Sequence, residues 1–176
     1  MVLACNAALS KGVDETIYLF MKDEQQVAAT FDGTNPLIIT GLAMKATEKL
    51  YAYQGRNYSN APKVTRNESD FDITFPHSIT FLVFSNNAVV KRELTAMSTR
   101  KDLGVIYKRV GGDFEVMGYN TGMKMSSLEW DPNADNKGAW VITLTAENEV
   151  NLPHTLLHKT GGNDDTAAYL QTLVTP

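Results

Sequence analysis

The stretch that decides the fold runs from residue 103 to residue 119 and reads Leu103-Gly-Val-Ile-Tyr-Lys-Arg-Val-Gly-Gly-Asp-Phe-Glu-Val-Met-Gly-Tyr119. Two segments rich in β-branched and aromatic residues, Leu103–Val110 and Phe114–Tyr119, flank the pair Gly111-Gly112. Because glycine reaches the backbone angles that a tight reversal needs, this pattern predicts an antiparallel hairpin. The chain is therefore expected to be built mainly from β-strands.

Similar strand patterns occur on both sides of this hairpin. A second hairpin is expected from Gly122–Trp130 and Ala139–Ala146, joined by a turn over 131–138. Further short strands are expected at Thr16–Met21, Val27–Phe31, Leu37–Thr40, Leu50–Tyr53 and Ser78–Phe84. The alternation of Phe71, Ile73 and Phe75 predicts one more strand, with these three side chains facing the core. Eight or nine short strands at this spacing predict a mainly β domain, either an antiparallel β-sandwich or a partly closed barrel.

One segment has the period of a helix. Val90, Leu94 and Met97 lie at positions i, i+4 and i+7, which places them on one face of a helix. Asn87 stands just before this segment and is a suitable N-cap. We therefore expect one α-helix over 87–98 that flanks the sheets.

Three segments do not fit inside a compact β core. They are residues 1–14, the polar run 54–70 and residues 156–176. We therefore expect an N-terminal arm over 1–14, a single β domain over 15–155 that contains a long hairpin loop over 54–70, and an extended C-terminal arm over 156–176. A short terminal helix is expected over 164–174 of that arm. Long arms on a compact domain are either disordered ends or devices for assembly.

Composition limits the classes of protein that this chain can belong to. The 176 residues are 43% hydrophobic, which suits one well-buried domain. A net charge of −4 argues against a globally basic nucleic-acid binder. No stretch reaches the roughly 18 apolar residues of a membrane span, so no membrane association is expected. The single cysteine, Cys5, cannot form an internal disulfide, and we expect an intracellular product.

Two patterns resemble metal sites and are better explained otherwise. His154 and His158 are four residues apart, but Thr155 stands where a zinc protease needs glutamate, so we expect ordinary polar residues in a linker. Asp131, Asn133 and Asp135 alternate as in a calcium loop, yet that loop's glycine and glutamate are missing from their required places. A hairpin turn is the favoured interpretation of the second pattern.

No sequence motif gives a positive reason to expect an enzyme. The chain has no phosphate-binding glycine loop and no nucleophile elbow. His77 follows Pro76 at a strand bend, where a hydrogen-bonded structural histidine is expected. We therefore expect no catalytic residues, no metal and no cofactor.

The distribution of charge is more informative than its total. Between Lys91 and Arg109 there are six basic and two acidic residues, and between Asp113 and Glu149 there are seven acidic and two basic ones. Either these are two solvated faces, or the basic face of one copy meets the acidic face of another and sets their register. The basic residues expected to take part in self-assembly are Lys91, Arg92, Arg100 and Lys101.

The C-terminal half resembles a known family. The run from Tyr107 to Met125, with its Gly111-Gly112 turn, resembles the hairpin of phage tail-tube and neck-ring structural proteins, and the segment from Lys137 to Asn148 is similar to their last hairpin. The beginning of the chain, from Cys5 to Phe20, is similar to proteins of phages that infect Bacteroidetes-type hosts.

The resemblance implies a tail-tube-like subunit without enzymatic activity, assembled in the host cytoplasm and located in the virion tail or neck. Such subunits close into six- or twelve-fold rings, contact adjacent tail, neck or portal proteins, and let DNA pass through without sequence-specific binding. Segment 54–70 and both termini would then lie at contacts between rings, and Ser78–Phe84 and the helix at or beneath the lateral interface. The residues of the loop expected at those contacts are Arg56, Asn57, Tyr58 and Arg66.

Other functions remain open at this point. The chain is alternatively a different head-to-tail completion protein or a capsid decoration protein. From another class, it is a glycan-binding β-sandwich whose binding face would use Tyr51, Tyr53, Tyr58 and Trp130. A hydrolase that uses His154 and His158 ranks last.

Overall fold

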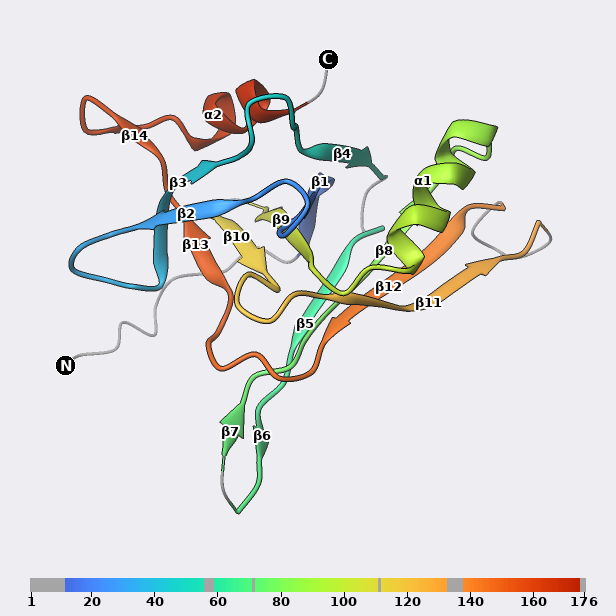
Figure 1. Ribbon diagram of the computed structural model, residues 1–176, viewed down its shortest axis with the longest axis horizontal. Helices are drawn as coiled ribbons and strands as arrows, with labels where there is room; N and C mark the ends of the chain where they lie inside the picture. The colour runs from blue at the N-terminus through green and yellow to red at the C-terminus, as the bar shows by residue number, and fades with distance from the viewer. Residues whose placement is uncertain (1–11, 56–58, 71, 111, 133–137, 175–176) are drawn as a thin grey trace.

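Strand β1 (Val13–Met21) lies at the centre of the fold, between two hydrophobic cores. The computed structural model describes residues 12–55, 59–70, 72–110, 112–132 and 138–174 (Figure 1). Because successive side chains of a strand point to opposite faces, Ile17 and Leu19 enter one core while Tyr18 and Phe20 enter the other. This explains why residues 17–21 of β1 are apolar or aromatic without interruption rather than alternating.

Seven strands form the larger sheet. Their order is β2 (Ala28–Phe31), β3 (Ile38–Ala43), β13 (His154–Leu156), β10 (Phe114–Met117), β9 (Leu103–Arg109), β1 and β4 (Tyr51–Gln54). All neighbours are antiparallel except β13 and β3. Gly104 of β9 lies against the buried ring of Phe20, and a Cβ there would come within 2.0 Å of that ring. The expected hairpin at 103–119 is confirmed as β9 and β10.

The smaller sheet packs against one face of the larger one. Its order is β11 (Lys124–Trp130), β12 (Trp140–Ala146), β8 (His77–Val83) and β5 (Ala61–Val64), and all neighbours are antiparallel. Side chains from β1, β9, β8 and β12 fill the first core between the two sheets. The expected second hairpin is confirmed as β11 and β12, and neither sheet closes into a barrel. The fold is thus mainly β and built of antiparallel sheets, as expected.

Helix α1 (Ala88–Ser98) begins and packs as its sequence predicts. The side-chain oxygen of Asn87 accepts a hydrogen bond from the Val90 N–H at 2.9 Å, which caps the helix. Leu94 and Met97 are buried in the first core, so α1 flanks the sandwich through its apolar face.

The C-terminal segment is not an extended arm, and this expectation is wrong. β13 pairs with both β10 and β3, and helix α2 (Thr166–Leu173) covers the second face of the larger sheet (Figure 1). Leu170 is fully buried in the second core. Between these elements, β14 (Lys159–Thr160) and β15 (Asn163–Asp164) form a small hairpin. Burial of apolar area therefore fixes residues 156–174 to the domain.

The N-terminal boundary is also different from the one expected. Residues 13 and 14, which we assigned to an arm, belong to β1, while residues 1–11, including Cys5, lie outside the described residues.

The polar run 54–70 is not one long loop. It contains β5, an edge strand of the smaller sheet, and β6 (Asn67–Glu68), which pairs with β7 (Ile73–Thr74) in a hairpin that projects from the body (Figure 1). Ile73 was expected in the core but is 44% exposed, because no layer of the sandwich reaches this hairpin. Phe75 is only half-buried, and Phe71 lies outside the described residues.

Candidate functional site: a polar groove beside α1

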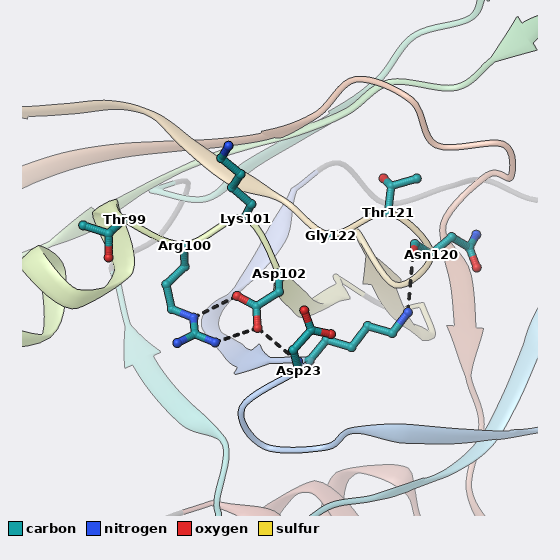
Figure 2. Close-up of a pocket in the computed structure, with 9 residues that line it drawn as sticks. Asp23, Thr99, Arg100, Lys101, Asp102, Asn120, Thr121 and Gly122 are labelled. Atoms are coloured by element: carbon teal, nitrogen blue, oxygen red, sulfur yellow. Dashed lines mark hydrogen bonds and ion pairs between the residues drawn. The ribbon is translucent and has the colours of Figure 1, made fainter.

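Three chain turns surround a groove of about 550 Å³ at the end of α1 (Figure 2). They are the turn after β1, the link from α1 to β9, and the turn between β10 and β11. We call this site the polar groove, and its lining residues are Lys22, Asp23, Thr99, Arg100, Lys101, Asp102, Asn120, Thr121 and Gly122. None of the nine is a histidine or a cysteine, and most are charged or carry an amide or hydroxyl group.

Arg100 is committed to contacts inside the subunit. Its Nε and Nη2 donate to the two carboxylate oxygens of Asp102 at 2.8 and 2.7 Å, and Nη1 forms an ion pair with Glu24. The hydrogen bonds from the guanidinium hold the pKa of Asp102 below its usual range. Asp102 also accepts from the Asp23 N–H at 3.0 Å, so this cluster joins the turn after β1 to the start of β9. The charge of Arg100 is therefore already paired inside the subunit, and its main role in the groove is to hold the wall in place.

Lys22 and Lys101 are the cations of the groove whose charge has no ion-pair partner among the described residues. Lys22 Nζ donates to the carbonyl oxygens of Tyr119 at 2.7 Å and Asn120 at 3.3 Å, and lies 4.7 Å from the centre of the Tyr119 ring. The side chain of Lys101 is exposed and has no hydrogen-bond or ion-pair partner in the described part of the chain. The groove can therefore accept a carboxylate from outside the subunit.

Two buried titratable side chains, Glu149 and His77, stabilise the wall of the groove that contains Thr121. Both the N–H and the hydroxyl of Thr121 donate to Glu149 Oε1 at 3.0 Å, and Glu149 is fully buried. Its Oε2 has no hydrogen-bond partner within the described residues. His77 Nδ1 accepts from the Gly118 N–H at 3.2 Å, so Nε2 carries the proton and donates to Asn151 O at 3.1 Å.

Burial lowers the pKa of His77, which keeps the ring neutral. The expectation of a hydrogen-bonded structural histidine is confirmed. The neighbouring turn also depends on Gly122, since its φ is +78° and a Cβ there would come within 2.4 Å of Lys101 O. The wall of the polar groove is thus fixed both by buried side chains and by backbone geometry.

The residues predicted for self-assembly do not form one surface. Arg100 and Lys101 line the polar groove, while Lys91 and Arg92 lie on the exposed side of α1. Arg66 is on the projecting hairpin, where it pairs with Glu68 at 2.8 Å. The remaining three predicted residues, Arg56, Asn57 and Tyr58, lie outside the described residues.

The two C-terminal histidines are not linker residues, which corrects the sequence interpretation. His154 is buried in β13, with its ring 5.7 Å from that of Phe31 and 5.8 Å from that of Tyr119. His158 stacks on Tyr169 at 4.0 Å, and its Nδ1 is 2.6 Å from Asp165 Oδ1. In the described part of the chain, no group of three or more His, Cys, Asp and Glu side chains is arranged to hold a metal ion.

The aromatic residues considered for glycan binding lie in two places. Tyr51 and Tyr53 line a mostly apolar groove of about 350 Å³ against α1, and the Tyr53 hydroxyl donates to Glu93 at 3.3 Å. Trp130 is 44% exposed and stacks on Trp140, with 5.9 Å between the ring centres.

Sequence reasoning identified Arg100 and Lys101 but missed Lys22, the turn 120–122 and Glu149. These residues meet only through the fold, and the one local signal was the spacing of Gly118 and Gly122 around a tight turn. Comparisons with protein-family models, with curated proteins and with solved structures found no match. Neither helix of the described chain is long and apolar enough to cross a membrane.

Proposed function

We propose that this protein is a non-enzymatic virion structural subunit that assembles with copies of itself into rings of a phage tail tube or of the neck between portal and tail. The observation that carries the proposal is the smaller sheet, which has one face outside both cores and two different edges, β11 and β5, that pair with no further strand among the described residues. Copies of this sheet can therefore join edge to edge through their outer strands.

The edges of the smaller sheet are surfaces for adding a strand. β11 is seven residues long and lies at one end of the strand order, and β5 lies at the other end. An edge strand leaves a row of backbone N–H and C=O groups without partners, and a neighbouring strand satisfies them. Because the two edges differ, contact between β11 of one copy and β5 of the next is head-to-tail, the type of contact that forms a ring when its rotation closes. Successive backbone groups of a strand point to opposite sides, and the Thr65 N–H donates to Pro76 O at 3.1 Å on the side of β8. Pro62 and Val64 therefore face the outer edge of β5, and because proline cannot donate, the Val64 N–H is the donor of β5 at this edge.

The face of the smaller sheet that points away from both cores has the chemistry expected for a DNA passage. Ile79 and Phe81 of β8 enter the first core, so the residues that alternate with them point the other way. On the two central strands this face carries Ser78, Thr80, Leu82, Val141, Thr143 and Thr145, all neutral. The hydroxyls of Thr80 and Thr143 lie 3.0 Å apart. The two central strands thus offer no cation to bind phosphates. The edge strands add Lys63 opposite Ser78 and Lys124 opposite Thr145 to this face, and Lys124 is paired with Glu147 at 2.9 Å.

Particle size and shape test this proposal. The purified full-length protein should form closed rings or stacked rings in negative-stain electron microscopy, with a mass that rises with protein concentration. Thr143→Lys should leave the rings intact and make them retain double-stranded DNA at low salt, while Thr34→Lys, in the exposed β2–β3 turn, should not. A monomer at every concentration would refute the proposal.

A glycan-binding module is the second candidate, favoured by the stacked and partly exposed Trp130. Exposed aromatic rings are suitable platforms for sugars, because one face of a pyranose is apolar. A glycan array tests it: specific binding that Trp130→Ala abolishes, shown by a monomeric protein, would favour this function over the structural one.

A further inference from the structure

We infer that the projecting hairpin of one copy docks by its acidic tip into the polar groove of a neighbouring copy. The acidic hairpin is defined here as residues 66–70 and 72–74, which include β6 and β7. The inference rests on the proposed function and names the two surfaces that would hold adjacent subunits together.

The acidic hairpin needs a partner surface on physical grounds. It consists of two strands of two residues each, and a two-stranded hairpin without a packed face is marginally stable in water. Its turn is closed by Ser69, whose N–H donates to Asp72 O at 2.9 Å and whose Oγ accepts from the Asp72 N–H at 3.1 Å. Its base is tied to the body by the bond from Phe75 N–H to Glu149 O at 2.7 Å. Between base and tip, Ile73 is 44% exposed and has no layer of the subunit to cover it.

The acidic hairpin contains three carboxylates, those of Glu68, Asp70 and Asp72, and one cation, Arg66. Glu68 is paired with Arg66, and Asp72 Oδ1 accepts a hydrogen bond from the Ile73 N–H at 2.8 Å. The side chain of Asp70 is exposed and has no hydrogen-bond or ion-pair partner in the described part of the chain. Asp70 is therefore the carboxylate most available to a neighbouring molecule.

The polar groove complements this tip in shape, and its lining has three cations, Lys22, Arg100 and Lys101, against two carboxylates, Asp23 and Asp102, which leaves a net charge of +1. It is concave, with a volume of about 550 Å³, whereas the hairpin is a narrow projection (Figure 1, Figure 2). Lys101 stands exposed at the groove, and the Lys22 ammonium is bound only by carbonyl oxygens. A carboxylate such as that of Asp70 would neutralise these cations, and Thr121 and Asn120 offer polar groups beside them.

Groove and hairpin are different surfaces of one chain, so the contact is head-to-tail and repeats from copy to copy. Within one subunit both surfaces contact Glu149, whose side chain accepts from the Thr121 N–H and whose backbone carbonyl accepts from the Phe75 N–H.

Charge exchange between Asp70 and Lys101 tests the inference. Asp70→Lys and Lys101→Glu should each weaken self-association of the full-length protein by about tenfold or more, as measured by sedimentation velocity at low salt, because each sets like charges against one another. An equimolar mixture of the two variants should associate again, since each groove then meets a tip of opposite charge. The double variant D70K/K101E should also associate.

Lys45→Glu is the matched control, because Lys45 is exposed between β3 and β4 and does not line the groove. It should associate as the wild type does, and circular dichroism should show that all variants are folded. If the wild type assembles and both single variants assemble equally well, or if the mixture fails to restore association, the docking inference is overturned while the proposed function stands. If the wild type does not assemble at all, both are overturned.

Discussion

Leu170→Ala tests whether the C-terminal segment belongs to the folded domain or serves only assembly. Leu170 is fully buried in the second core, where α2 covers β1, β3 and β9. Truncation of a fully buried leucine removes its transfer free energy and leaves a cavity, which costs about 3 kcal/mol in most cores. Domains of this size are stabilised by roughly 5–15 kcal/mol, so this is a large fraction of the total. At about 2–4 °C per kcal/mol, the melting temperature should fall by about 6–12 °C.

Urea denaturation at protein concentrations where the wild type is monomeric measures this effect without any contribution from assembly. Ala168→Ser is the matched control, because Ala168 is exposed on the same helix and its change should cost no more than about 0.5 kcal/mol. If Leu170→Ala lowers the free energy of unfolding by less than about 1 kcal/mol, α2 does not stabilise the domain in the way described here.

Three further predictions concern the cores and the groove wall. Gly104→Ala places a Cβ within 2.0 Å of the Phe20 ring and should lower the free energy of unfolding by more than about 2 kcal/mol. Adding Phe20→Leu in a double variant should restore part of this loss. Chemical denaturation of the two single variants and the double variant measures both effects. Burial lowers the pKa values of His77 and His154, so the unfolded chain binds more protons, and the free energy of unfolding should fall as the pH is lowered through about 6.5. Urea titrations between pH 8 and pH 5 measure this fall, and a rise in stability toward acid pH would contradict it. Glu149→Ala leaves the N–H and the hydroxyl of Thr121 without their acceptor and should lower the free energy of unfolding by about 1–3 kcal/mol. Amide hydrogen exchange in the β10–β11 turn should become faster. Unchanged exchange would show that this carboxylate does not stabilise the groove wall.

The strands and the first helix could be predicted because their signals are local. The Gly111-Gly112 turn lies between two apolar runs, and the predicted hairpin is formed by β9 and β10. Helix α1 has both an N-cap, Asn87, and an apolar stripe. In each case the residues that define the element are also the residues that stabilise it.

The helix expected over 164–174 is confirmed as α2, but the docking of the C-terminal segment on the larger sheet could not be predicted, because its stabilising partners are distant in sequence. Leu170 packs with residues of β1, β3 and β9. The run 54–70 was misleading for a similar reason. β5 is an edge strand with alternate residues exposed, so its composition resembles that of a loop although it pairs with β8.

The candidate site could be predicted only in part. Arg100 and Lys101 were identified from the local excess of basic residues, but the sequence does not show that Arg100 is already bound by Asp102 and Glu24. Lys22 and Thr121 reach the groove from turns that are far apart along the chain. Only the three-dimensional structure shows which cation is paired within the subunit, such as Arg100, and which can bind a group from outside, such as Lys101.

The central place of β1 has a consequence for biosynthesis. This strand is made before two of the partners that cover it, since β9 follows it in the chain and Leu170 of α2 follows β9. At typical elongation rates of about 5–20 residues per second, on the order of ten seconds or longer passes between the synthesis of β1 and that of Leu170. The second core is therefore completed only after α2 has been made, and until then the side chains of β1 that enter it lack this cover.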